Sequence, residues 1–198
     1  MILVTGGAGF VGSRVATRLV QQGETPRVLV RDAAKARQHL PTSGVEFVIG
    51  DTTQPDTLRA AVTGVDTIIH CAFITADRKQ GPGVNYAATN VTGTNNLIAA
   101  AKDAGVQRIV EMGGLGTRPS TPGSYMQGRY EADEALKHSG LAWSILGPSI
   151  QFGHGSAFFN GLAGLIKSVP LVVPVVGSGK LQFQPIWVED TVTCILKM

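Results

Sequence analysis

Short β-branched runs alternate with amphipathic helical stretches along this chain, and this alternation restricts the fold more than any other feature. The runs with the length and composition of strands are Ile2–Val4, Arg27–Val30, Glu46–Ile49, Thr67–His70, Arg108–Met112 and Ala142–Leu146. The stretches with helical apolar spacing are Val11–Gln22, Ala33–Leu40, Pro55–Val62, Thr89–Ala104 and Ser124–His138. Several of them are followed by a glycine that suits the left-handed position past a helix end, at Gly23, Gly64, Gly105 and Gly140. This order predicts an α/β fold in which a parallel sheet is covered by helices on both faces.

The strands and right-handed crossovers predict a doubly wound parallel sheet of the dinucleotide-binding (Rossmann) type over residues 1–147. After residue 147 the chain becomes rich in glycine and proline, with an apolar helical stretch at Phe158–Ser168. The chain ends within a further helical stretch, Val188–Lys197, which carries Glu189 and Asp190 in its first turn. We interpret residues 148–198 as part of a substrate lobe that packs on the first domain, and we expect the lobe to be truncated.

The composition excludes several classes of protein. Of the 198 residues, 43% are hydrophobic and 16% are charged, and the net charge of +3 comes from scattered lysines and arginines, which does not favour a nucleic-acid-binding face. Cys71 and Cys194 are far apart, so we expect reduced core thiols rather than a disulfide, and no spacing typical of a metal site occurs. The chain contains no run that fits a signal peptide or a membrane span, which favours a cytoplasmic protein.

A glycine-rich loop follows the first predicted strand and opens the first predicted helix. It reads TGGAGFVG from Thr5 to Gly12, and Gly6, Gly9 and Gly12 fit the pattern G-x-x-G-x-x-G. Such a loop lets a pyrophosphate approach the backbone N–H groups of a helix N-terminus, which side chains at these positions would block. The polar stretch 73–85 follows the fourth strand, at the edge where open α/β folds bind ligands.

The residues after the second and third strands predict which dinucleotide binds. Arg31 and Asp32 follow the second strand, where an acid binds the ribose hydroxyls of NAD and an arginine pairs with the 2′-phosphate of NADP. We favour NADP, with Lys35 as a second cation, because Asp32 has an alternative role as a helix cap. Asp51 and Thr52 follow the third strand, where they either contact the adenine or cap the next helix.

These motifs resemble the extended and atypical branches of the short-chain dehydrogenase/reductase superfamily, including NmrA-like and complex I accessory-subunit-like proteins. The matching motifs are TGGAGFVG, VLVRD, GD at 50–51, HCA at 70–72 and NVTGTNNLIAAA. The tail from LAWSILGPSIQFGHG to PIWVEDTV also resembles the atypical branch. The resemblance implies dinucleotide contacts from Phe10, Val11, Cys71, Ala72 and Asn90 in addition to the loop glycines.

In catalytic members of this superfamily a tyrosine serves as acid or base, a lysine four residues later lowers its pKa, and a serine orients the substrate. Tyr125 matches the tyrosine, and Arg129 occupies the lysine position on the same helix face. Arginine supplies charge but cannot give up its proton as lysine can. Gly113 and Gly114 stand where the serine is expected, and Thr117 is the nearest other hydroxyl. The glycines either admit a ligand or form a bare turn.

The sequence leaves two functions open. The first is an NADP(H)-dependent oxidoreductase or epimerase-like enzyme for a small carbonyl or sugar-like substrate, with Tyr125 and Arg129 in its catalytic site. The second is a catalytically silent protein that binds the dinucleotide for structure, assembly or redox sensing. The apolar stretch around Phe158, Phe159 and Leu162 either lines the substrate pocket or belongs to the core. A homodimer through the 89–104 and 124–138 helices is an expectation from the superfamily.

Overall fold

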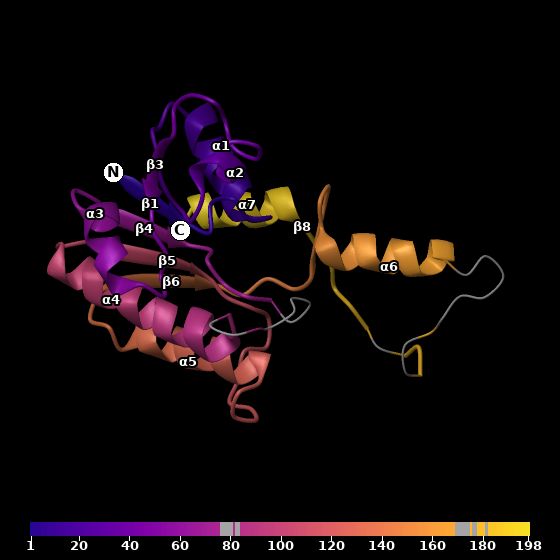
Figure 1. The fold of residues 1–198 in the computed structure, drawn as a ribbon. Helices are drawn as coiled ribbons and strands as arrows, with labels where there is room; N and C mark the ends of the chain where they lie inside the picture. The colour runs from indigo at the N-terminus through magenta and orange to yellow at the C-terminus, as the bar shows by residue number, and fades with distance from the viewer. Residues whose placement is uncertain (76–80, 82–83, 169–174, 176–177, 181) are drawn as a thin grey trace.

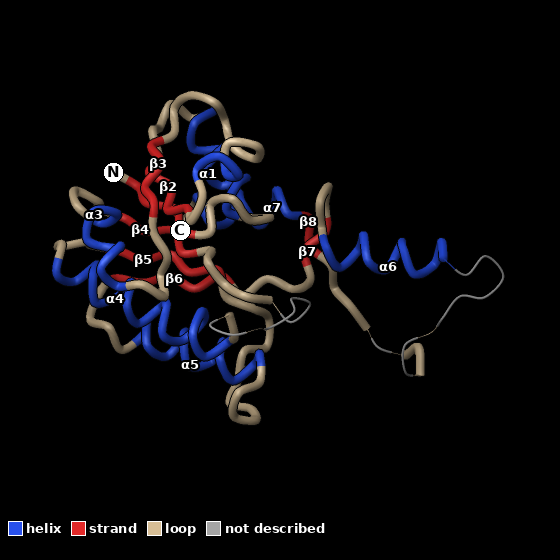
Figure 2. The backbone as a smooth tube through the Cα atoms, in the orientation of Figure 1, coloured by secondary structure: helices blue, strands red, loops and turns tan. Residues whose placement is uncertain are grey.

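The computed structural model describes residues 1–75, 81, 84–168, 175, 178–180 and 182–198, and part of the polar stretch 73–85 therefore lies outside it. A six-stranded parallel sheet runs through the molecule in the order β3-β2-β1-β4-β5-β6 (Figures 1 and 2). Its strands are β1 (Ile2–Thr5), β2 (Arg27–Val30), β3 (Glu46–Ile49), β4 (Thr67–His70), β5 (Arg108–Met112) and β6 (Ala142–Leu146). The order reverses between β1 and β4, so the predicted doubly wound fold is confirmed.

Helices cover both faces of this sheet, as the alternation predicts. On one face the buried residues of α3 (Leu58–Val62), α4 (Gly93–Asp103) and α5 (Tyr125–Lys137) pack in one core cluster. On the other face α1 (Gly12–Gln21), α2 (Ala33–Ala36) and α7 (Val188–Leu196) form a second cluster (Figure 1). Adjacent strand residues point to opposite faces: Leu3 belongs to the first cluster and Val4 to the second.

The predicted strands agree with the observed ones to within one residue, and the glycines after α1, α3, α4 and α5 all have positive φ. Two helices differ from prediction. The stretch Ala33–Leu40 is helical only to Ala36, and the chain then tightens into turns in which Gln38 and His39 donate to carbonyls three residues earlier. The stretch predicted to begin at Thr89 begins at Tyr86, with a π-helical segment η2 (Tyr86–Thr92) before α4 and a short 3-10 segment η1 (Pro55–Thr57) before α3.

The C-terminal residues divide into a part that joins the core and a part that projects from it. Helix α7 lies beside α1, and its residues Val192 and Ile195 are buried in the second cluster. Strands β7 (Gln151–Phe152) and β8 (Ile186–Trp187) form a small parallel pair, from which α6 (Ala157–Ser168) extends away from the sheet (Figure 1). None of the residues of α6 is buried, so the interpretation of this helix as part of the core is wrong.

Two further findings concern the cysteines and the search for membrane-spanning helices. In the described part of the chain both cysteines are free thiols, but Cys194 is exposed and Cys71 is half-buried, so the expectation of two core thiols is wrong for Cys194. Cys194 lies on the outer face of α7, whose other face packs against α1. Among the helices that the structure describes, none has the length and hydropathy needed to cross a membrane.

Candidate functional site

The glycine loop lies at the carboxyl edge of the sheet, between the ends of β1 and β4. Gly6 has a φ of 65°, and a Cβ atom there would lie 2.5 Å from the backbone oxygen of Cys71. A Cβ atom on Gly12 would lie 2.3 Å from the backbone oxygen of Gly6. These contacts are with backbone, which cannot move aside, so the close packing of strand, loop and helix requires glycine at both positions. Helix α1 begins after Val11, whose side chain cannot cap it, and in its first turn the Ser13 N–H donates to the Gly9 carbonyl at 3.1 Å, which ties the helix start to the loop.

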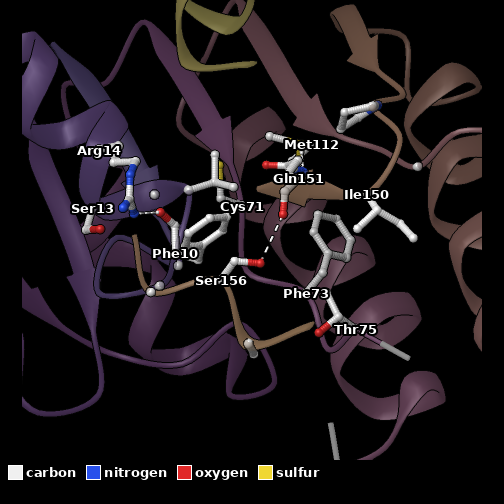
Figure 3. A pocket seen from close by; sticks show the side chains of 18 of the residues that line it. Phe10, Ser13, Arg14, Cys71, Phe73, Thr75, Met112, Ile150, Gln151 and Ser156 are labelled. Carbon is white, nitrogen blue, oxygen red and sulfur yellow. Dashed lines mark hydrogen bonds between the residues drawn. The ribbon is translucent and has the colours of Figure 1, made fainter. Parts of the chain in front are cut away.

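A cavity of about 1190 Å³ extends from this loop across the carboxyl ends of β4 and β5 (Figure 3). Several of the predicted site residues line it, namely Gly6, Gly9, Phe10, Val11, Gly12, Cys71, Tyr125 and Arg129. The other predicted residues lie outside its lining, namely Arg31, Lys35, Asp51, Thr52, Ala72 and Asn90. The cavity therefore joins the glycine loop to the predicted catalytic pair. Of the second group, Ala72 still borders the loop, because a Cβ atom on Gly6 would lie 2.8 Å from its backbone nitrogen.

The residues after β2 combine an exposed cation with a helix cap. The Asp32 side chain accepts a hydrogen bond from the backbone N–H of Lys35 at 3.1 Å, which lowers the pKa of its carboxyl and confirms its role as the α2 cap. Arg31 is exposed, and its Nη1 atom lies 3.9 Å from Oδ2 of Asp51. The ammonium group of Lys35 lies 3.7 Å from Asp32. Two cations and two carboxylates thus meet at the carboxyl ends of β2 and β3.

Asp51, Thr52 and Asn90 make internal contacts. Asp51 accepts hydrogen bonds from the backbone and hydroxyl of Thr53, whereas Gln54 precedes the next helical turn, so the alternative that Asp51 or Thr52 caps it is wrong. Thr52 is only 4% exposed, and its hydroxyl packs close to Gly93. The Asn90 amide is buried and bonds both the N–H and the carbonyl of Ile74, which fixes the chain after β4.

Tyr125 is the first residue of α5, directly after the Ser124 cap that accepts from the backbone N–H of Gln127. Its ring packs edge-on against Tyr86, with centroids 5.6 Å apart. The Tyr125 hydroxyl lies 3.7 Å from the position that a Cβ atom would take on Gly114, and the Thr117 hydroxyl lies at the same distance from that point. Both residues line the cavity, so two hydroxyl groups flank one small space at the end of β5.

Gly113 and Gly114 have different reasons for lacking a side chain. A Cβ atom on Gly113 would lie 2.8 Å from the Ile145 side chain and 3.0 Å from the Leu146 carbonyl, so strand β6 excludes a side chain there. A Cβ atom on Gly114 would meet only the Thr117 and Tyr125 hydroxyls, at ordinary contact distance. Gly113 is therefore glycine because β6 packs against it, a reason that neither predicted alternative named, whereas Gly114 has the open space that the ligand alternative requires.

Arg129 is 1% exposed and lies in a buried charge cluster. Its Nη2 atom donates to the carbonyl of Met112 at 2.7 Å and lies 3.2 Å from Glu111 and 3.3 Å from Asp133. The Phe73 ring covers the guanidinium, with its centroid 3.7 Å from Cζ. Burial raises the pKa of Glu111, although the positive charge of Arg129 opposes the shift. Arg129 is therefore held from below by β5 and α5 and covered from above by an aromatic ring.

Three atoms of this cluster have no hydrogen-bond partner in the described part of the chain, namely Nε and Nη1 of Arg129 and Oε2 of Glu111. Next to it, His70 is fully buried between the hydroxyls of Thr5, at 2.6 Å, and Thr94, at 3.1 Å. Burial and the charge of Arg129 lower the pKa of His70 to about 3, so its ring is neutral. Burial raises the pKa of Cys71 to about 12, which keeps this group a thiol rather than a nucleophilic thiolate.

Sequence reasoning missed part of the cavity wall. The missed residues beyond β6 include Pro148, Ile150, Gln151, His154 and Ser156, whereas Phe158 also lines the cavity, as one of the two sequence alternatives had it. Figure 3 shows Gln151 beside Met112, and its Nε2 atom lies 3.9 Å from the Met112 sulfur. Strand β7 has only two residues, so no periodic pattern marks it. In the part of the chain that the structure describes, no cluster of histidine, cysteine and acidic side chains could hold a metal ion.

Comparisons with known proteins agree with the glycine loop and the sheet order. A family model described as NAD(P)H-binding matches residues 6–151. The NAD(P)H azoreductase of Xenophilus azovorans is 38% identical over 149 residues, which cover 75% of this chain and 47% of that protein. The photosystem II assembly factor Ycf39 of Cyanophora paradoxa is 28% identical over 197 residues, which cover 100% of this chain and 54% of that protein. The chain thus spans about half the length of these two curated relatives.

Among solved structures, MoeE5 in complex with UDP-glucose and NAD matches with a TM-score of 0.75 at 24% identity. The match covers 98% of this chain and 70% of MoeE5. At this identity the likeness concerns the fold, and it extends over the small C-terminal elements as well as the sheet.

Proposed function

Because the chain belongs to the NAD(P)H-binding family, among proteins like the short-chain dehydrogenases/reductases, we propose that it is an NADPH-dependent reductase of a small, lipophilic carbonyl compound. The observation that carries this proposal is the pair of hydroxyls, from Tyr125 and Thr117, in a cavity that continues to the glycine loop. A carbonyl that accepts a hydride also needs a proton for its oxygen, and these hydroxyls are donors suited to that task.

The glycine loop fits a dinucleotide. Gly6 and Gly12 are packed so closely on backbone that a Cβ atom would fill the cradle, and the start of α1 has N–H groups for a pyrophosphate. In our proposal Gly9, Phe10 and Val11 complete this cradle, and Cys71 and Ala72, whose backbone lies against Gly6, would form its wall. Asp51 and Thr52 lie at the adenine end, and Asn90 acts by fixing the chain after β4. The dinucleotide supplies the hydride.

The residues of the chain then have separate tasks. Tyr125 donates its phenolic proton to the substrate oxygen as the hydride reaches the carbonyl carbon, and it regains a proton from solvent. The Thr117 hydroxyl, which in this structure donates to the Gly114 carbonyl at 2.8 Å, exchanges that bond for one to the same oxygen and so stabilises the negative charge that develops there. The Arg129 charge lies beneath this site, although Glu111 and Asp133 balance it. Apolar groups surround the space for the substrate, among them Phe73, Met112, Ile150 and Phe158.

The experiment that tests this function is a spectrophotometric assay of NADPH consumption with a panel of aliphatic, aromatic and sugar-like carbonyl compounds. Steady consumption with an apolar member of the panel is the expected result. An azo compound belongs in the panel, because the azoreductase of X. azovorans is a relative of this chain. An epimerase-like reaction would leave the dinucleotide unchanged overall, so products need separate analysis with sugar-like substrates.

Arg31 supports a preference for NADPH, because it is an exposed cation after β2 while Asp32 is engaged as a helix cap. We expect Arg31→Ala to raise the Kd for NADPH about tenfold, the value of one charge-assisted hydrogen bond, and to leave the Kd for NADH nearly unchanged. Fluorescence titration of the two dinucleotides measures this. Arg59→Ala is the control, since Arg59 is an exposed cation on α3 away from the site. Equal loss of NADH and NADPH would remove Arg31 from phosphate recognition.

The role of Thr117 is tested by moving the hydroxyl. We expect Thr117→Val to lower kcat about a hundredfold, because it removes one donor to the developing negative charge. Gly114→Ser in the same background is expected to recover much of this loss, because a Cβ atom at Gly114 would lie next to the positions of the Thr117 and Tyr125 hydroxyls. Gly113→Ser is the control, since strand β6 leaves no room there. Full activity of Thr117→Val would exclude the hydroxyl from the reaction.

A second candidate function is a protein that binds the dinucleotide without turnover. The observation that favours it is the burial of Arg129, whose charge is balanced by Glu111 and Asp133. Its relative Ycf39, matched along the whole of this chain, is an assembly factor. Tight NADPH binding together with no consumption over the substrate panel would favour this function over the reductase.

A further inference from the structure

The far end of the chain reaches the glycine loop through one carboxylate. Glu189 lies in the first turn of α7, where the helix dipole favours a negative charge. Its Oε1 atom lies 3.2 Å from Nε of Arg14, and its Oε2 atom lies 2.7 Å from Nη2 of Arg18. The three side chains are partly buried, with 22% to 33% of each exposed. Glu189 thus ties α7 to two successive turns of α1, the helix that the glycine loop opens.

Arg14 carries this connection into the loop. Its Nη1 atom donates to the carbonyl of Phe10 at 2.5 Å, and its Nη2 atom donates to the carbonyl of His154 at 2.6 Å. The guanidinium also lies over the Phe10 ring, 4.6 Å from the centroid, and Figure 3 shows the two side chains together. Each nitrogen of Arg14 is therefore engaged within the protein. Arg14 thus holds the loop in place, and only the second hydrogens of its Nη1 and Nη2 atoms remain for a ligand.

The turn at Gly153 packs against the other side of Phe10. A Cβ atom on Gly153 would lie 2.7 Å from the Val188 side chain and 3.8 Å from the Phe10 ring, and its φ is 150°. Phe10 therefore fits between Arg14 and the turn that precedes α6. Loop, turn and the start of α7 pack against one another at a single point.

We propose that Glu189 is a positioning residue for the dinucleotide loop, which it orients through Arg14. The inference rests on the proposed binding of a dinucleotide at the glycine loop, and it adds that the last helix takes part in that binding. The loop must hold its N–H groups toward the phosphates before they arrive, since ordering them on binding costs affinity. Without Glu189, Arg14 loses its third anchor and is free to leave the Phe10 carbonyl.

A purely electrostatic effect of Glu189 would change the Kd for NADPH in the opposite direction. Glu189→Gln removes a negative charge near a site for a polyanion, so a purely electrostatic role for Glu189 predicts tighter binding in the variant. A positioning role predicts weaker binding in spite of the gain in positive charge. The sign of the change in Kd therefore distinguishes the two.

The test is a titration of the full chain with NADPH, together with thermal unfolding with and without NADPH. We expect Glu189→Gln to raise the Kd about fivefold, in the range of one partly buried ion pair, and to reduce the rise in Tm that NADPH produces. Asp190→Asn is the matched control, because it removes the same charge from the next, exposed residue. It is expected to leave the Kd unchanged or slightly lower.

Variants at Arg14 and Arg18 distinguish an effect on the loop from an effect on the contact between α1 and α7. Arg18 pairs with Glu189 but, among the residues that the structure describes, its side chain makes no hydrogen bond to the loop, so Arg18→Gln is expected to weaken NADPH binding less than Arg14→Gln. If the Glu189→Gln variant does not fold, Arg14→Lys replaces it in the test. Lysine keeps the positive charge but loses the forked contacts of arginine, so the same rise in Kd is expected.

An unchanged or lower Kd in Glu189→Gln, or in Arg14→Lys where that variant replaces it, would overturn the inference. So would an equal effect of Arg18→Gln and Arg14→Gln. Failure of the unmodified chain to bind NADPH would instead overturn the proposed function itself, so the two failures are distinguishable.

Discussion

Gly12→Ala is expected to abolish measurable binding of NADPH and NADH. The added methyl group would lie 2.3 Å from the Gly6 oxygen and 2.8 Å from the Gly6 carbonyl carbon, both of which belong to the backbone of the loop. The helix can accept this methyl group only by moving away from the loop, which removes the N–H groups from the position that a pyrophosphate needs. Overpacking of this kind costs about 1–3 kcal/mol of stability. Fluorescence titration measures binding of the dinucleotides, and thermal unfolding measures the accompanying loss of stability.

Gly161→Ala is the matched control, because Gly161 lies in α6 with no atom within 4 Å of the added Cβ. There the same change is expected to leave dinucleotide binding intact and to favour the helix by about 1 kcal/mol. Normal binding by a folded Gly12→Ala variant would show that the loop does not hold the phosphates, and the cofactor site would have to be sought elsewhere in the cavity.

The sheet could be predicted because its information is local. Each strand is a short β-branched run, and Gly23, Gly64, Gly105 and Gly140 mark the ends of the helices between them. The glycine loop is also local, since strand, loop and helix follow one another directly. Parallel pairing with right-handed crossovers then leaves few arrangements for six strands.

The chemistry of the site could be predicted less well, because it depends on contacts between distant elements. The spacing of Tyr125 and Arg129 predicts a shared helix face, but it cannot show that Glu111 on β5 and Phe73 after β4 enclose the guanidinium. The contact between Arg18 and Glu189 joins residues 171 positions apart. Nothing in either local sequence indicates it, because an acidic residue in a first helical turn is common.

Helix α6 shows a different limit. Its apolar side chains predict either a core helix or a pocket wall, yet Phe158, Leu162, Leu165 and Ile166 are each about 40% exposed. Hydrophobicity predicts that a surface needs cover, but it does not specify which element supplies it. Only Phe158 of this helix, with Ala157 before it, reaches the lining of the cavity.

Tyr125→Phe is expected to lower kcat for NADPH-dependent reduction at least about a hundredfold, because general acid catalysis by a positioned group contributes about 10²–10⁴. The change removes one oxygen atom and keeps the ring that packs against Tyr86, so the fold and the Kd for NADPH are expected to stay the same. Tyr130→Phe, one turn further along α5 and outside the cavity lining, is the control and is expected to retain full activity.

The pair of variants distinguishes the two candidate functions. A large loss in Tyr125→Phe with normal binding would assign the proton to Tyr125 and support the reductase. Turnover within threefold of the unmodified chain would mean that Tyr125 is a packing residue and that another group, or water, protonates the product. The Thr117 hydroxyl would then be the next candidate, and it would have to give up its hydrogen bond to the Gly114 carbonyl to act as the donor.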